Sequence, residues 1–111
     1  MMIGKRTLSI SGGRSTETVD IVVSSPEPDG ERWVCSYSIG WPTGPQTRRV
    51  HGVDGIAAVN SALMMIGLDV NGSVYHQQGR LHWMEPFVGL GFPVPKAARD
   101  LLTGEDAELF G

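Results

Sequence analysis

The stretch that decides the fold is residues 55–79, GIAAVNSALMMIGLDVNGSVYHQQG, which carries one formal charge, at Asp69. Apolar side chains recur along it in steps of three and four, a spacing that places them on one face of a helix. They are Ile56, Val59, Leu63, Ile66, Val70 and Val74. We expect this face to pack on the apolar side of a β-strand over residues 33–39 and so to form the core.

A second line of side chains lies roughly opposite the first, because residue 58 is about 200° round the helix from residue 56 at about 100° per residue. It consists of Ala58, Ser61, Met65, Leu68 and Gly72, which we call the small-residue stripe. A solvent-facing helix side carries Lys and Glu, so a side this apolar is normally covered. Either the segment Pro86–Leu102 or another copy of the chain can cover it. We favour an isologous homodimer, because that segment is rich in Gly and Pro.

The sequence marks the start of this helix more clearly than its end. Asp54 suits the N-cap, because its carboxylate can accept hydrogen bonds from the free amides of the first turn. Gly67 can end the helix as its C′ residue, or it can lie inside a longer helix. Two interior glycines cost roughly 2 kcal/mol together relative to alanine, whereas burying Val70 and Val74 gains about 1.5 to 3 kcal/mol each. This comparison favours the longer helix, over residues 54–76.

Alternating apolar and polar side chains predict strands before this helix. The clearest strand carries Trp33, Cys35, Tyr37 and Ile39 on one side and Val34, Ser36 and Ser38 on the other. Further strands are predicted at residues 5–11, 17–24 and 46–51, with a short one at residues 80–83. The segment Ser25–Gly30 is predicted to be a turn, because it is rich in Pro and Gly. Consecutive strands without an intervening helix favour an antiparallel meander.

The predicted fold is therefore α+β. An antiparallel sheet of four to five strands packs on one long helix, residues 54–76, and a short C-terminal helix follows at residues 96–103. The 111 residues suit a single domain, residues 1–111, because domains cluster near roughly 100 to 150 residues.

Composition excludes several classes of partner. Nucleic-acid binding needs a concentrated basic stripe, whereas the net charge is −3 and the densest basic cluster is Arg48 and Arg49. Polar residues interrupt residues 55–79 too often for a bilayer span, so we expect no membrane partner. The one cysteine, Cys35, cannot form an internal disulfide, and no apolar run follows Met1. These features predict a cytoplasmic protein.

Four short motifs stand in a distinctive order. They are Trp33-x-Cys35-x-Tyr37-x-Ile39, Gly52-Val53-Asp54 before an alanine-rich helix, Gly79-Arg80-Leu81-x-Trp83, and Gly91-Phe92-Pro93-x-Pro95. Together they resemble a family of small bacterial single-domain proteins of unknown function, over about residues 30–95. The resemblance implies a compact domain from a bacterium or one of its phages. Because no activity is established for that family, the resemblance implies no catalytic or binding residues.

The sequence offers little catalytic chemistry. Cys35 would be a nucleophile if His51 on the neighbouring strand reached it, but a thiol that shares a strand face with apolar side chains is more often a buried hydrophobe. The histidines His51, His76 and His82 lack the close spacing of zinc ligands. Gly89-Leu90-Gly91 lacks the third glycine of a dinucleotide-binding loop. We therefore expect no catalytic residue, no cofactor and no metal.

Two functional hypotheses remain. In the favoured one the chain is a non-enzymatic protein-interaction module, a homodimer with a regulatory or toxin-neutralising role by analogy with other small acidic bacterial proteins. Because Trp and Arg dominate interface hot spots, the candidate partner-recognition residues are Trp41, Arg48, Arg49 and His51. In the alternative, the chain binds a small molecule or is a small enzyme. The pocket would then be lined by Trp83, Phe87 and Phe92.

Overall fold

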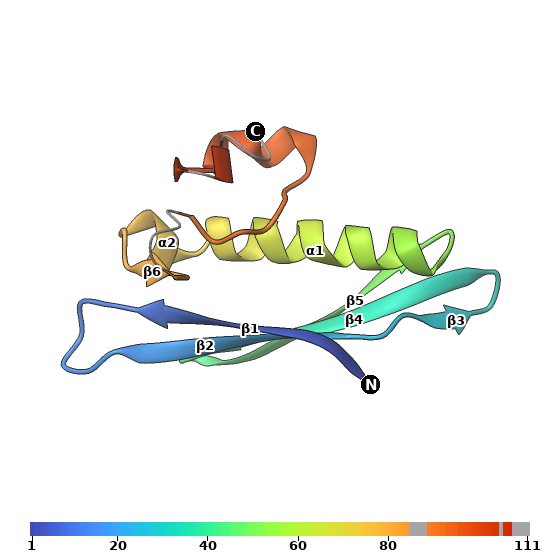
Figure 1. Ribbon diagram of the computed structural model, residues 1–111, viewed down its shortest axis with the longest axis horizontal. Helices are drawn as coiled ribbons and strands as arrows, with labels where there is room; N and C mark the ends of the chain where they lie inside the picture. Colours follow the sequence, from blue (N-terminus) through green and yellow to red (C-terminus); the bar gives the residue numbers. More distant parts are fainter. Residues whose placement is uncertain (85–88, 105, 108–111) are drawn as a thin grey trace. The chain divides into compact units, whose positions relative to one another are not determined.

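In the computed structural model, strands β4 (Arg32–Trp41) and β5 (Gly44–Gly52) form an antiparallel hairpin (Figure 1). Successive side chains of a strand point to opposite sheet faces. Along β4, Cys35, Tyr37 and Ile39 are buried, whereas the serines between them are only half-buried. The predicted alternation is therefore confirmed from Cys35 to Ile39, whereas Val34 is also buried and Trp33 is half-buried.

Among the described residues, six strands make up the sheet. The other four are β1 (Met2–Ile10), β2 (Glu17–Ser24), β3 (Glu27–Asp29) and β6 (Leu81–His82). The strand order is β3-β4-β2-β1-β6, and β5 pairs with β4. The pairs β1–β6, β2–β4, β3–β4 and β4–β5 are all antiparallel. The α+β class with an antiparallel sheet is thus confirmed.

The prediction of four to five strands was too low, and β3 accounts for part of the difference. This strand lies inside the segment that was predicted to be a turn, and it pairs Glu27 with Val34 and Asp29 with Arg32. Three residues are too few to show an alternating pattern. Pro28 at its centre is tolerated because an edge strand has one side without ladder hydrogen bonds.

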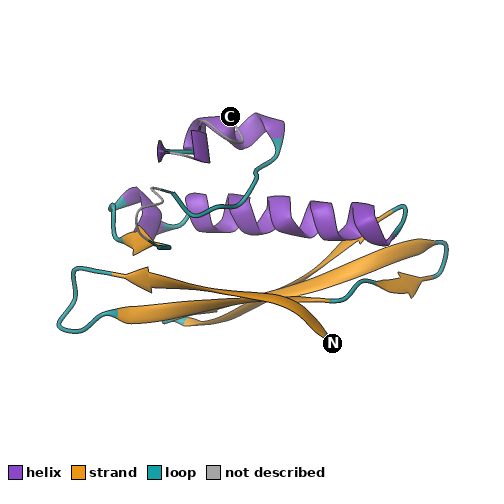
Figure 2. Ribbon diagram, viewed as in Figure 1, coloured by secondary structure: helices purple, strands orange, loops and turns teal. Residues whose placement is uncertain are grey.

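The structure describes residues 1–84, 89–104 and 106–107. They form two compact units, which we describe separately. Figure 2 colours the helices and strands of the described residues. The first unit comprises residues 1–7 and 19–63, and the second comprises residues 8–18 and the described residues from 64 onward. Strand β1 and helix α1 (Gly55–Asn71) each contribute residues to both units. The single-domain organisation stays a prediction.

In the first unit, apolar side chains of β2, β4 and the start of α1 are buried. They include Val19, Ile21, Val23, Cys35, Tyr37, Ile39, Ala58 and Ala62. The predicted N-cap is confirmed, because the Asp54 carboxylate accepts a 2.7 Å hydrogen bond from the Ala57 amide. Gly52, at the end of β5, lies so close to the helix backbone that a Cβ atom there would collide with residues 57 and 58. The missing side chain therefore lets α1 start directly against the end of β5.

In the second unit, the end of β1 pairs with β6, with Ser9 opposite His82. The buried apolar side chains include Leu8, Ile10, Ile66, Val70, Leu81, Leu90, Phe92, Val94 and Leu102. Arg80 supports the strand end, because its Nε donates a 2.6 Å hydrogen bond to the Ser11 carbonyl oxygen. Gly67 touches the backbone of Pro93, so the segment after residue 90 approaches α1 at a position without a side chain.

Helix α1 ends at Asn71 and not at residue 76 as predicted. Ser73 explains the break, because its Oγ donates a 2.7 Å hydrogen bond to the Val70 carbonyl oxygen and accepts one of 3.2 Å from the His76 amide. Side-chain bonds of this kind offer the backbone an alternative to the helical ladder. A separate short helix, α2 (Val74–Gln77), then begins with Ser73 as its N-cap.

The C-terminal helix predicted at residues 96–103 is a 3₁₀ helix, η1 (Lys96–Leu101). Its hydrogen bonds span three residues, as in the 2.9 Å bond from the Ala98 amide to the Pro95 carbonyl oxygen. Pro95 at the N-cap makes no side-chain capping hydrogen bond. A short uncapped segment of this kind is typical of 3₁₀ structure, which is used in short pieces.

The predicted core face is only partly buried, so this prediction was wrong for the first turns of α1 and for Val74, which is 55% exposed and lies in α2. Ile66 and Val70 are fully buried, as expected, but Ile56 is 83% exposed. Ala58 is fully buried in its place. The close contact with Gly52 turns the alanine side of the helix inward there, and only a small side chain suits such an approach.

Candidate functional site

The start of α1 forms one wall of an open groove in the first unit. The groove has a volume of about 450 Å³ and is lined by Pro26, Gly55, Ile56, Val59, Asn60 and Leu63. Five of these residues come from the first nine positions of α1, and Pro26 comes from the connection between β2 and β3. We call this feature the α1 groove.

The α1 groove is apolar and carries no ionisable side chain among its lining residues. Its rim is unusually exposed for aliphatic side chains, since Ile56 is 83% accessible and the nearby Val53 is 79% accessible. Exposed aliphatic side chains that form a contiguous patch mark interaction sites, whereas single exposed ones are normal on a protein surface. The residues predicted to be core at this end of the helix therefore line a surface that a partner can reach.

The small-residue stripe has no uniform environment. Ala58 is fully buried, Ser61, Met65 and Leu68 are half-buried, and Gly72 is exposed. Close packing at the buried end reflects the contact of the helix backbone with Gly52. A role of the stripe in dimerisation stays a prediction.

The candidate recognition residues on the β4–β5 hairpin fall into two groups. The register places Arg48 opposite Tyr37 and Arg49 opposite Ser36. Since directly opposed residues share a face, Arg48 lies on the face of the buried Tyr37, and Arg49 lies on the other face. The structure therefore does not bring the predicted residues together as one cluster.

Trp41 belongs to the same sheet face as Arg48, because it follows Tyr37 and Ile39 at alternate positions of β4. Its indole Nε1 donates a 2.8 Å hydrogen bond to Gln46 Oε1 on β5. This contact ties the two strands together at the turn end of the hairpin. It gives Trp41 a structural role that the sequence did not indicate.

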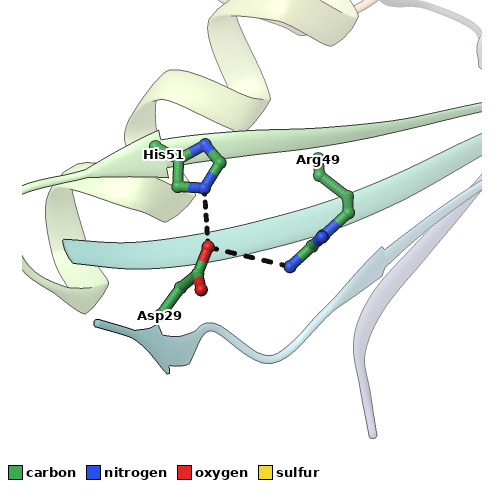
Figure 3. Close-up of polar contacts among 3 residues, drawn as sticks. All are labelled: Asp29, Arg49 and His51. Carbon is green, nitrogen blue, oxygen red and sulfur yellow. Dashed lines mark hydrogen bonds and ion pairs between the residues drawn. The ribbon is translucent and has the colours of Figure 1, made fainter. Parts of the chain in front are cut away.

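Arg49 and His51 are joined by a residue that sequence reasoning missed, Asp29 of β3 (Figure 3). His51 Nε2 lies 2.9 Å from Asp29 Oδ2, and Arg49 Nη2 lies 3.9 Å from the same oxygen. An ionised carboxylate can only accept hydrogen bonds, so His51 Nε2 is the donor. The pattern could not reveal this contact, because Asp29 lies in the segment predicted to be a turn.

The electrostatics of this cluster favour a charged Asp29. The hydrogen bond from His51 holds the pKa of the Asp29 carboxyl below its ordinary value, and the positive charge of Arg49 acts in the same direction. All three side chains are accessible, with 48% of Asp29, 64% of Arg49 and 39% of His51 exposed. The cluster therefore forms a solvated polar link across β4.

Cys35 cannot pair with His51. The register places Cys35 opposite Val50 and His51 opposite Val34, which puts the thiol and the imidazole on opposite faces of the sheet. Cys35 is fully buried, and its Sγ donates a 3.3 Å hydrogen bond to the Ser24 carbonyl oxygen. Burial raises the pKa of the Cys35 thiol, which disfavours the nucleophilic thiolate.

The residues of the alternative pocket lie in the second unit. Phe92 is 5% exposed and Trp83 is half-buried, whereas Phe87 lies outside the described residues. The neighbouring His82 is engaged with Ser11, with 2.9 Å between its Nε2 and the serine Oγ. The described side chains contribute packing here, and the pocket stays a prediction.

In the part of the chain that the structure describes, no three or more His, Cys, Asp and Glu side chains gather as a metal site would require. None of its helices is both long enough and apolar enough to cross a bilayer.

No curated protein and no solved structure matches the chain. The family model described as Domain of unknown function (DUF6968) matches residues 4–94. This range contains most of β1, the other five strands, helices α1 and α2, and the residues of the α1 groove. With most of its 111 residues matched, the chain belongs to the DUF6968 family, a family of unknown function.

Proposed function

We propose that the chain is a non-enzymatic protein-interaction module that binds a second copy of itself through the α1 groove. The observation that carries this proposal is the exposure of Ile56, 83% accessible, on the rim of a groove formed with Pro26, Val59 and Leu63. Burying one aliphatic side chain of this size gains about 1.5 to 3 kcal/mol. A partner that covers the groove therefore gains free energy that the isolated chain does not.

The charge pattern supports a second copy as that partner. In an isologous dimer the same patch meets itself, so any charge at its centre faces a like charge. The first nine residues of α1, Gly55 to Leu63, carry no charge, although the whole chain has a net charge of −3. The patch also combines a protruding side chain, Ile56, with a recess beside Val59 and Leu63. These features make it complementary to itself.

The size of the groove sets the expected strength of association. Stable interfaces bury about 800 Å² on each partner, and a groove lined by six residues provides only part of that area. We therefore expect a dissociation constant on the order of 10 to 100 μM for the homodimer. The homodimer would then act by binding another protein, as a regulator or a toxin-neutralising protein does.

The proposal is tested with one charged variant in the α1 groove and two charged variants outside it. Ile56→Glu places a carboxylate at the centre of the self-contact, and an unpaired buried charge is strongly unfavourable. Thr43→Glu adds the same charge at the exposed β4–β5 turn. Met65→Lys places a charge in the small-residue stripe instead. Sedimentation velocity at several concentrations measures self-association for each protein.

We expect Ile56→Glu to weaken self-association at least tenfold, and Thr43→Glu to leave it within twofold of the parent. Thermal melting checks that the Ile56→Glu protein remains folded, which its exposed position leads us to expect. If Met65→Lys dissociates a dimer that Ile56→Glu leaves intact, the interface is the small-residue stripe and the α1 groove is not the binding surface.

A further inference from the structure

Strand β5 has one edge that no strand of the described residues pairs with. It pairs with β4 along its whole length, from Gly44 opposite Trp41 to Gly52 opposite Trp33, and no other strand among the described residues pairs with it. A strand edge offers a row of backbone donors and acceptors to another extended chain. Nine residues exceed the usual strand length of about five to six, so the edge is long enough to hold an added strand.

The side chains of β5 give this edge a definite charge. Its sequence, GPQTRRVHG, contains two adjacent arginines and no acidic residue. Arg48 and Arg49 are both exposed, and as consecutive strand residues they point to opposite faces of the sheet. One guanidinium thus stands on each face beside the same edge.

The positions of the two arginines determine which side chains the added strand should carry. Residues directly opposite each other in neighbouring strands share a face, and opposite charges there stabilise the pair. Two consecutive acidic residues in the added strand therefore place one carboxylate beside each arginine. Arg49 keeps donors for such a contact, because a guanidinium has five N–H groups and its contact with Asp29 is made through Nη2, at 3.9 Å.

The same charges disfavour pairing of β5 with β5 of a second copy. If the β5 strands of two copies paired antiparallel with Arg48 and Arg49 at the centre, arginines would lie directly opposite one another. Like charges that are directly opposite on neighbouring strands destabilise a sheet. The edge therefore differs from the α1 groove, whose neutral surface suits self-contact. We propose that the outer edge of β5, with its two adjacent arginines, binds an extended segment of another protein that carries two consecutive acidic residues.

A synthetic nine-residue peptide provides the probe. It carries two consecutive glutamates at its centre, flanked by alternating threonine and valine, and a fluorescein label at its N-terminus. A matched peptide has two lysines in place of the glutamates. Fluorescence anisotropy with the full chain measures the affinity of each peptide. We expect the glutamate peptide to bind at least ten times more tightly than the lysine peptide.

Charge reversal in the protein gives the second arm. The double variant Arg48→Glu with Arg49→Glu is expected to bind the lysine peptide more tightly than the glutamate peptide. The double variant Arg14→Glu with Arg99→Glu has the same net charge, and both residues are exposed and lie outside β5. It is expected to keep the preference of the parent, with an affinity within threefold.

Amide hydrogen exchange locates the bound peptide. Slower exchange in residues 44–52 of the parent protein, on addition of the glutamate peptide, supports an added strand on β5. Protection that lies elsewhere, or no binding of the glutamate peptide up to about 1 mM, overturns the proposal. Equal affinities of the parent for both peptides also overturn it, because the arginines would then only prevent edge-to-edge pairing.

Discussion

Gly67 lies against the carbonyl group of Pro93, so that a Cβ atom on residue 67 would occupy the space of the Pro93 oxygen. An alanine at an interior helix position is normally about 1 kcal/mol more favourable than glycine. Here the collision involves a backbone atom, which cannot move as a flexible side chain does. The contact therefore requires glycine, although the helix continues on both sides of it.

We predict that Gly67→Ala destabilises the protein by about 1 to 3 kcal/mol, because overpacking outweighs the gain in helix propensity. Urea unfolding followed by circular dichroism measures the change. Gly4→Ala is the matched control, since no atom lies within 4 Å of its added Cβ. A Gly67→Ala protein as stable as the parent would show that the segment at Pro93 does not rest on α1.

In the second unit, Asp106 holds the backbone at Leu90 and Gly91 in place. Its carboxylate is fully buried and accepts hydrogen bonds of 2.6 Å from the Leu90 amide and 2.9 Å from the Gly91 amide. Asp106→Ala removes both acceptors, and each buried group left unsatisfied costs about 1 to 3 kcal/mol. We predict a loss of at least about 2 kcal/mol in the free energy of unfolding. Asp100→Ala, at an exposed position, should change it by less than about 0.5 kcal/mol.

The link between Asp29 and His51 predicts a dependence on pH. The pKa of folded Asp29 is depressed, mainly by the hydrogen bond from His51. Its stabilising contribution is therefore present above the ordinary pKa of aspartate, about 3.9, and is lost as the pH falls through the lower folded pKa. Carboxyl NMR should give Asp29 a pKa below the ordinary value in the parent and a higher one in His51→Ala. An unchanged pKa in that variant would contradict the contact.

Cys35 is predicted to react slowly in the native protein. The thiol is fully buried, and burial raises its pKa, so the reactive thiolate is scarce and shielded. Labelling by a thiol reagent should follow unfolding, with a rate that rises in urea as the unfolded population does. Rapid stoichiometric labelling without denaturant would place the thiol at the surface and contradict the burial of this β4 face.

Local patterns predicted the parts of the fold that local physics controls. The alternation around Tyr37 specified a strand with one buried face, and the Asp54 carboxylate marked the helix start, because each depends on neighbouring residues. The inward side of α1 depends on a contact with Gly52, which no periodicity reveals. Ile56 belongs to a regular apolar line and yet is exposed.

The candidate site was harder to predict for the same reason. The groove depends on the approach of Pro26 to the start of α1, and the Asp29–His51 contact depends on pairing of β3 with β4. Both arise from residues in a Pro- and Gly-rich segment that predicts a turn. The break after Asn71 depends on hydrogen bonds of Ser73, which outweigh the apolar spacing that continues to Val74.

Self-association through a neutral apolar groove is the central claim, and the mass of the unaltered protein in solution tests it most directly. Sedimentation equilibrium from roughly 10 μM to 1 mM covers the range in which the expected dimer forms. The chain has a mass of 12.0 kDa, so we expect a weight-average mass that rises with concentration toward twice that value. A mass of 12.0 kDa across the whole range would contradict it.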